Sequence, residues 1–420
     1  MKICILAYWY EPMQAVGALR AESFYKYASD SDVDAFVVTV EPNTRYTTSV
    51  DKDCPNDAKI FRIPGFNANA YLRNLRGKPS KPVNSVNHSV QSASPIKKFL
   101  YYIYRQIICY PDTHFLWPFM AKKKLKEIIE KEKPDVILTT AFPVSSFILG
   151  KYIKKKFPEI KWVADYRDLW SEHQWVYRPW PLSALEKRLE KRTVKAADLI
   201  LTTSSEFQKQ LRKLFPGQEI PIIYNGYDEA VNDASCKTQK FTISYTGILY
   251  EEQKTDLFFS SLRELIDDKK IDSQNLQIDF YGKSSNDLFQ NIDKYKLDSS
   301  VNIHGMVERE KVIKAQRESN ILLVIRWDDG PLHVKVFEYL SARVPILAMV
   351  KAESEIAQLV NEAHAGQAAE DKNTIKEFIL QEYVYWEENG TNRLIEKSDK
   401  VDEFSRSNQA KNLYNLLKEL

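Results

Sequence analysis

Short apolar runs alternate with amphipathic segments along most of the chain, and this alternation constrains the fold more than any other feature. In the first half the strand-like runs are Lys2–Tyr8, Ala35–Val40, Asp135–Thr140, Lys161–Tyr166 and Leu199–Thr203. In the second half they are Phe241–Tyr245, Leu276–Tyr281, Val301–His304, Ile321–Ile325 and Pro345–Val350. Strands that alternate with helices predict an α/β protein with parallel sheets covered on both faces. Each half has enough strands for one doubly wound, Rossmann-like domain.

A polar stretch near the middle, Glu229–Gln239, is the expected linker between the two domains. We therefore predict an acceptor-side domain over residues 1–231 and a second domain over 232–402. The last helix, within 403–420, is expected to pack back on the first domain. Two such domains would face each other across a cleft, where strand ends and helix N-termini bind ligands.

Composition excludes several classes of protein. The 420 residues are 44% hydrophobic and 28% charged, which is typical of a folded globular chain. The net charge of +3 gives no overall signature of nucleic-acid binding. The four cysteines have no paired spacing, so we expect neither disulfides nor zinc, and a reducing cytoplasm. No apolar run is long enough to span a bilayer, and we interpret Ile3–Tyr10, which Glu11-Pro12 ends, as a first buried strand.

Positive charge is concentrated in residues 68–126. This segment holds eleven Lys/Arg against one acid, Asp112, so it carries +10 while the rest of the chain carries −7. Aromatic residues are interleaved with the basic ones, a pattern that suits an anionic membrane surface. A solvated charged face over an aromatic core is the alternative. Nucleic acid is disfavoured because no binding module accompanies the charge.

Three loops carry candidate ligand-binding residues. Gly17 and Arg20 lie at the start of the first helix, and Lys254 precedes a helix in the second half. Glu338 lies one turn into a helix that Gly330-Pro331 prepares, between apolar neighbours. A buried carboxylate needs hydrogen-bond donors, which a ribose diol supplies. A lone glycine or lysine is by itself commonly a turn or a surface residue, and no dinucleotide or P-loop motif is present.

Four sequence blocks together resemble glycosyltransferase family 4, whose retaining enzymes have the two-Rossmann (GT-B) fold. Lys335–Ala348 (KVFEYLSARVPILA) resembles the K-x-x-E-Y-L-A-A-G-x-P-I-L-A block of the family, and Asn225–Asp228 resembles its N-G-V-D turn. Tyr245-Thr246-Gly247 is similar to its Y-x-G strand end. Asp165–Trp170 (DYRDLW) resembles the D-x-R-D-P-W motif of members that build cell-surface polysaccharides.

The resemblance implies roles for individual residues. Glu338 matches the acid that holds the donor ribose, Lys254 the basic residue on the diphosphate, and Val307 the strand end where the base packs. Asp168 and Asp165 are the candidate catalytic residues, with Asp168 positioning the acceptor or acting as base. The expected donor-binding residues are Gly17, Arg20, Gly247, Lys254, Val307, His333, Val334, Lys335 and Glu338. His173 is a weaker candidate.

The sequence departs from the family pattern at two positions. The first acid of the family's E-x7-E motif falls at Gly330, with Asp329 one position away, and the arginine that often follows Y-x-G is Ile248. With the family's arginine replaced by Ile248, Lys254 is the basic residue expected to contact the diphosphate, and Arg326 is the alternative. The acid pairs Asp328-Asp329 and Asp32-x-Asp34 lack further ligands, so we expect no metal and no cofactor beyond the donor.

The resemblance implies a retaining transferase that moves a sugar from a UDP- or GDP-linked donor to a hydroxyl. The expected acceptor is a growing, polyprenyl-diphosphate-linked cell-surface glycan. The expected location is the cytoplasmic face of the inner membrane, reached through the basic segment 68–126. Two alternatives stay open: another GT-B enzyme such as a nucleotide-sugar epimerase, and a catalytically silent nucleotide-sugar-binding scaffold, which the two departures favour.

Overall fold

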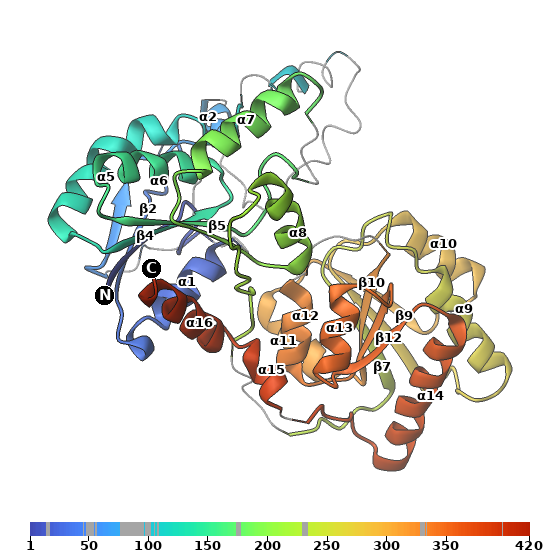
Figure 1. The fold of residues 1–420 in the computed structure, drawn as a ribbon. Coiled ribbons are helices and arrows are strands. Elements are labelled where there is room, and N and C mark those ends of the chain that lie inside the picture. Colours follow the sequence, from blue (N-terminus) through green and yellow to red (C-terminus); the bar gives the residue numbers. More distant parts are fainter. Residues whose placement is uncertain are drawn as a thin grey trace. The chain divides into compact units, whose positions relative to one another are not determined.

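The chain forms two compact α/β units, seen in a computed structural model (Figure 1). The first unit comprises Met1–Tyr224 and Gln409–Leu420, and the second comprises Asn225–Asn408. The structure describes residues 1–13, 17–44, 46–47, 54, 57–75, 96, 102–104, 106, 109–173, 178–228, 234–327, 332, 334–396 and 398–420.

The first unit is built on a parallel sheet of six strands. The strands are β1 (Lys2–Leu6), β2 (Asp34–Val40), β3 (Ile60–Ile63), β4 (Val136–Ala141), β5 (Lys161–Tyr166) and β6 (Leu199–Thr202). Their order is β3-β2-β1-β4-β5-β6, and each neighbouring pair is parallel. The order reverses between β1 and β4, which is the point where open parallel sheets bind ligands at the carboxyl edge.

Helices cover both faces of this sheet. They are α1 (Ala18–Lys26), η1 (Ser29–Ser31), α2 (Ala68–Leu75), α5 (Trp117–Glu132), α6 (Ser145–Lys156), α7 (Leu182–Val194), α8 (Ser205–Leu214) and α16 (Arg406–Lys418). One face packs against apolar side chains of α5, α6 and α8. The other face packs against α1 and α16 (Figure 1).

The end of the chain completes the core of the first unit. Ala410, Leu413, Tyr414 and Leu417 recur at helical spacing and are buried beside Ile3 and Val37 of the sheet. The Tyr414 hydroxyl also donates a hydrogen bond to the carbonyl of Phe24 in α1. Helix α16 therefore supplies part of a face that residues 1–224 leave uncovered.

The second unit repeats this plan. Its strands are β7 (Phe241–Thr246), β8 (Leu276–Tyr281), β9 (Val301–Gly305), β10 (Ile321–Arg326), β11 (Ile346–Val350) and β12 (Gly366–Ala369). The order is β12-β11-β10-β7-β8-β9, again parallel, with its reversal between β7 and β10. The helices are α9 (Asp256–Asp267), α10 (Asn286–Lys294), α11 (Arg309–Arg317), α12 (Val334–Ala342), α13 (Glu355–Glu362), α14 (Lys372–Asn389) and α15 (Asp399–Glu403).

The predicted α/β class with two parallel sheets is confirmed. The division between Tyr224 and Asn225 precedes the boundary at 231/232 that the polar stretch suggested. The Asn-, Ser-, Pro- and Lys-rich composition of residues 66–96 predicts a long loop, and this prediction was wrong at its start, where α2 forms. Residues 76–95 and residues 229–233 of the expected linker lie outside the described residues.

Candidate functional site

The carboxyl edge of the second sheet brings Lys335 against Gly247. Strand β7 ends at Thr246, and Gly247 follows with a φ of 108°, a value that favours glycine. Lys335, in the first turn of α12, places its Nζ 2.7 Å from the Tyr245 hydroxyl and 4.0 Å from the centre of that ring. A Cβ built on Gly247 would lie 3.5 Å from the Lys335 Nζ. The ammonium group therefore lies directly beside the bare backbone of the Y-x-G turn.

The environment of Lys335 destabilises its charged form. The pKa of Lys335 is lowered to about 7: burial is the largest cause, Glu338 opposes the shift, and the charge of Arg326 adds to it. A lysine whose positive charge is poorly compensated gains most from an anionic ligand. The arrangement suits a diphosphate, because an ammonium group and exposed backbone are both available at one strand end.

Two tyrosines fix the end of β7, which this lysine contacts. The Tyr339 hydroxyl accepts a hydrogen bond from the backbone N–H of Thr246 at 2.9 Å. The Tyr245 hydroxyl lies 2.9 Å from the carbonyl oxygen of Ile248, to which it donates. Burial raises the pKa of Tyr339 to about 12, so it stays a neutral donor and acceptor. The turn at Gly247 is thus held by side chains from β7 and α12 together.

Glu338 lies one turn beyond Lys335 and lines a small pocket of about 120 Å³. Its Oε1 is 3.5 Å from Nη2 of Arg309, which is the first residue of α11. Val307, the expected position of the base, is half-buried and precedes that helix by two residues. Glu338 is therefore paired with Arg309, a residue that the sequence motifs did not single out.

Lys254 lies in a different setting from the one expected. Its side chain is 61% exposed, and its Nζ is 3.3 Å from Oδ1 of Asp287 near the start of α10. Gly247 instead has Lys335 as its basic neighbour. Val334 begins α12, whereas His333, Asp329 and Gly330 lie outside the described residues.

The carboxyl edge of the first sheet brings Gly17, Arg167 and Asp168 together. Gly17 precedes α1, and a Cβ built there would lie 1.8 Å from Nη1 of Arg167. Nη2 of Arg167 is in turn 2.7 Å from Oδ2 of Asp168. Only glycine therefore lets the guanidinium group lie against the start of α1 while it holds Asp168.

Arg20 and Asp165 form a separate, fully buried pair. Nε and Nη2 of Arg20 each donate to a different oxygen of Asp165, both at 2.8 Å. Nη1 of Arg20 donates to the carbonyl of Ile223 at 2.8 Å. Both side chains are nearly inaccessible to solvent, so we infer that they hold the first unit together rather than contact substrate.

A buried polar cluster beside β1 was missed by the motif analysis. Oδ1 of Asp112 accepts from the backbone N–H of His114 and from the Ser145 hydroxyl, and Oδ2 accepts from the Ser145 N–H. The His114 ring contacts the Tyr8 ring at 4.2 Å and lies 3.0 Å from the Asn67 amide nitrogen. Asp112 therefore joins the start of α6 to the loop that precedes α5. The sequence did contain a signal for this cluster, because Asp112 is the one acid in the strongly basic segment 68–126.

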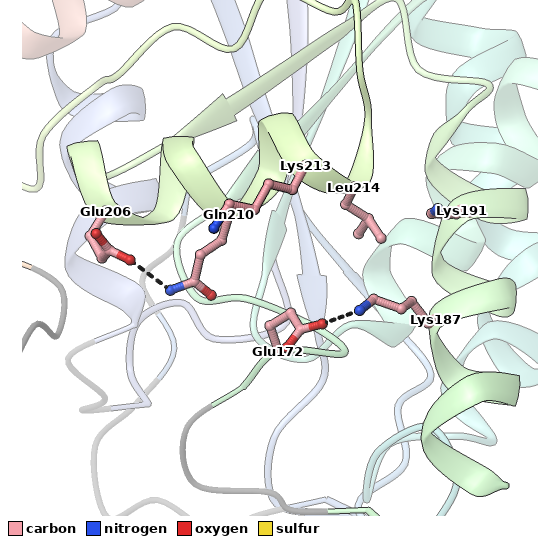
Figure 2. A pocket seen from close by; sticks show the side chains of 7 residues that line it. All are labelled: Glu172, Lys187, Lys191, Glu206, Gln210, Lys213 and Leu214. Carbon is pink, nitrogen blue, oxygen red and sulfur yellow. Dashed lines mark hydrogen bonds and ion pairs between the residues drawn. The ribbon is translucent and has the colours of Figure 1, made fainter. Parts of the chain in front are cut away.

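A larger pocket of about 490 Å³ lies between α7 and α8 (Figure 2). Six of its seven lining side chains are polar or charged: Glu172, Lys187, Lys191, Glu206, Gln210 and Lys213. Lys187 pairs with Glu172, and the Gln210 amide donates to Glu206 (Figure 2). His173, next to Glu172, lies against the ring of Phe142. Within the part of the chain that the structure describes, no three His, Cys, Asp or Glu side chains are grouped to hold a metal.

Comparison with known proteins identifies the class of this chain. Residues 69–231 match the profile of Glycosyltransferase Family 4. No curated protein sequence matches the chain.

Solved structures share the fold over the whole chain. Sucrose-phosphate synthase from Thermosynechococcus elongatus is 14% identical, with a TM-score of 0.59 and coverage of 100% of this chain and 98% of that one. Anabaena HepE, solved with UDP and glucose, is 13% identical with a TM-score of 0.58, and both chains are covered completely. The lipopolysaccharide outer core galactosyltransferase WaaB is 14% identical with a TM-score of 0.53, again over 100% of both chains.

Both parallel sheets have the same strand order, and solved structures share this fold over the whole chain. The family match over residues 69–231, most of which belong to the first unit, agrees with that fold. The chain therefore has the two-Rossmann, GT-B fold, with a match to Glycosyltransferase Family 4 over residues 69–231.

Proposed function

We propose that the protein transfers a sugar, with retention of configuration, from a nucleoside diphosphate sugar to a hydroxyl of a lipid-linked cell-surface glycan. The observation that carries this proposal is the contact of Lys335 with Gly247 at the carboxyl edge of the second sheet. HepE is solved with UDP and with UDP-glucose, and WaaB is a lipopolysaccharide galactosyltransferase, which supports a nucleotide donor and a glycan acceptor.

Cleavage of the anomeric C–O bond builds negative charge on the leaving diphosphate. Lys335 is placed to stabilise that charge, and one well-placed donor of this kind typically contributes about 3–4 kcal/mol to catalysis. Retention without a protein nucleophile is explained by attack on the same face, with a diphosphate oxygen taking the acceptor proton. The proposal needs no metal, because the protein cation acts where the charge develops.

Asp168 is the proposed acceptor-positioning residue or base. It follows β5, its side chain is partly exposed, and Arg167 holds one of its oxygens, which leaves the other available to a hydroxyl. Glu338, with Arg309 on one oxygen, is proposed to hold the donor ribose with the other. Gly17, at the start of α1, is proposed to lie near the donor or acceptor.

The test is ligand binding followed by turnover. UDP, GDP and a panel of their sugar conjugates should raise the melting temperature selectively, since a ligand at 100 times its dissociation constant adds about 2.7 kcal/mol. Lys335→Ala and Glu338→Ala should abolish the shift, whereas Asp168→Asn should keep it and lose transfer to a polyprenyl-linked acceptor. Lys240→Ala is the matched control, because it removes an exposed cation of the same unit at the opposite end of β7 from Gly247.

The silent-scaffold alternative gives a different pattern. A nucleotide-dependent shift with neither transfer nor donor hydrolysis, on any acceptor tried, would favour it over an enzyme. A protein that no nucleoside diphosphate stabilises would contradict both.

A further inference from the structure

Three large apolar side chains are exposed at the start of two helices of the first unit. Trp180 is 81% exposed and Leu185 54% exposed, at the start of α7, and Phe119 is 72% exposed in the first turn of α5. Helix α5 leads into β4 and α7 leads into β6, so both helices begin at the carboxyl edge of a parallel sheet. Asp168 follows β5 at that same edge.

The solvent side of α7 is purely basic among its charged residues. Its two acids face inward: Glu186 lies 2.8 Å from Nε of buried Arg178, and buried Glu190 accepts from the Tyr166 hydroxyl at 2.9 Å. The exposed charged side chains of the helix are Lys187, Arg188, Lys191 and Arg192. Lys187 forms an ion pair with Glu172 (Figure 2). Among the described residues, no acid lies within ion-pair distance of the other three.

The positive charge continues onto α6 and α5, which lie beside α7 on one face of the sheet (Figure 1). The Lys151 Nζ lies 2.6 Å from the carbonyl of Arg192, and burial together with the charges of Arg192 and Lys155 lowers the pKa of Lys151. Lys122 of α5 lies over the rings of Phe119 and Tyr152. Cations from three neighbouring helices therefore share one face, although Lys124 and Lys126 of α5 are paired with Glu127 and Glu130, and Lys154 of α6 with Asp198.

We propose that this face of the first unit, formed by α5, α6 and α7, docks on an anionic lipid bilayer, with Trp180, Leu185 and Phe119 entering the interfacial region. The inference rests on the proposed lipid-linked acceptor and names the surface that reaches it. Exposed aromatic and aliphatic tips beside lysine and arginine are what a headgroup layer accommodates, since the rings sit at the interface and the cations meet lipid phosphates.

A membrane explains the two kinds of side chain together. A nucleic acid or an acidic protein would use the cations but would leave Trp180 and Phe119 exposed to water at the edge. No helix in the described ranges is long and apolar enough to cross a membrane. Docking at the carboxyl edge would also bring Asp168 next to the lipid surface.

The test uses the full chain and phospholipid vesicles. Binding to vesicles containing phosphatidylglycerol should exceed binding to phosphatidylcholine vesicles and weaken with added salt. Brominated lipid should quench the tryptophan fluorescence of the wild type, and Trp180→Phe should remove most of that quenching. The double change Arg188→Glu and Lys191→Glu should weaken partitioning by at least roughly 25-fold, since each surface cation contributes about fivefold. The control Lys237→Glu and Lys240→Glu makes the same change of net charge on the second unit and should have no effect.

Three outcomes would overturn the proposal: equal binding to both vesicle types, quenching that survives Trp180→Phe, or equal loss in the control. Failure here is distinguishable from failure of the proposed function, because the thermal shift with UDP does not depend on vesicles. A protein that responds to UDP and ignores anionic vesicles would keep the transferase proposal and lose this one.

Discussion

At the scale of single residues, the two aspartates of the D-x-R-D-x-W motif each pair with an arginine, but in opposite surroundings. Asp165 is buried against Arg20, whereas Asp168 is partly exposed and held by its neighbour Arg167. A buried charge left without its partner costs about 3–5 kcal/mol, and an exposed pair contributes about 0–1 kcal/mol. Substitution of the two aspartates of this motif should therefore have different effects on stability and on activity.

We expect Asp165→Ala to lower the free energy of unfolding by about 3–5 kcal/mol, because Arg20 would stay buried without a counter-charge. Asp168→Ala should change it by less than about 1 kcal/mol while removing transfer activity. Urea unfolding followed by fluorescence measures both variants. Equal loss of stability in the two variants would contradict the distinction.

Lys335 makes nucleotide affinity depend on pH. Its pKa of about 7 lies below the usual value of 10.5, so the ligand-free protein loses this charge as the pH rises through 7. A diphosphate binds the protonated form, so the dissociation constant for UDP should rise by up to about tenfold per unit above pH 7. Calorimetric titrations between pH 6 and 9 measure this slope.

Lys335→Arg is the control, because arginine stays charged over this range. The variant should bind UDP with the weaker pH dependence of the nucleotide itself. The same steep slope in both proteins would show that another group titrates.

The sequence predicted some of these residues and missed others for a physical reason. Lys335 and Glu338 are three residues apart on a helix, so one motif carries both. Lys254 was expected on the diphosphate because it precedes a helix and matches the basic residue of the family, and this expectation stays a prediction. Its partner Asp287 belongs to another helix, and local spacing carries no information about such a contact.

At the scale of elements, the sequence predicted ten of the twelve strands and missed β3 and β12, the two with weak apolar patterns. Strand β3 is only four residues long and half-buried, so its apolar pattern is weak. Strand β12 reads Gly-Gln-Ala-Ala, and a Cβ on Gly366 would lie 2.0 Å from the carbonyl oxygen of Ile346. Close approach to β11 there demands a residue that β propensity disfavours.

Helix α16 gives a prediction at this scale. Leu413 is fully buried between α16 and the sheet of the first unit, so Leu413→Ala should lower the free energy of unfolding by about 2–5 kcal/mol. Asn412→Ala, on the exposed side of the same helix, should change it by less than about 0.5 kcal/mol. Chemical denaturation compares the two, and similar midpoints would mean that α16 adds little to the core.

At the scale of the whole molecule, two different sequences reach the same strand order. In both units the first strand lies in the middle of the sheet, and the order reverses beside it, between β1 and β4 or between β7 and β10. The residues at the two reversals differ: Tyr8 lies beside His114 in the first unit, and Lys335 beside Gly247 in the second. The strand pattern alone therefore predicted the architecture twice but not the chemistry at either edge.

The return of the chain to the first unit has a consequence for synthesis. A ribosome makes residues 1–224 first, yet the segment that closes their sheet, Gln409–Leu420, emerges last. The second unit is uninterrupted in sequence and can finish folding while its predecessor still waits with one sheet face bare. The nascent polypeptide thus completes its domains in the reverse of the order in which it starts them, and a premature stop near the terminus would spoil the earliest-made half.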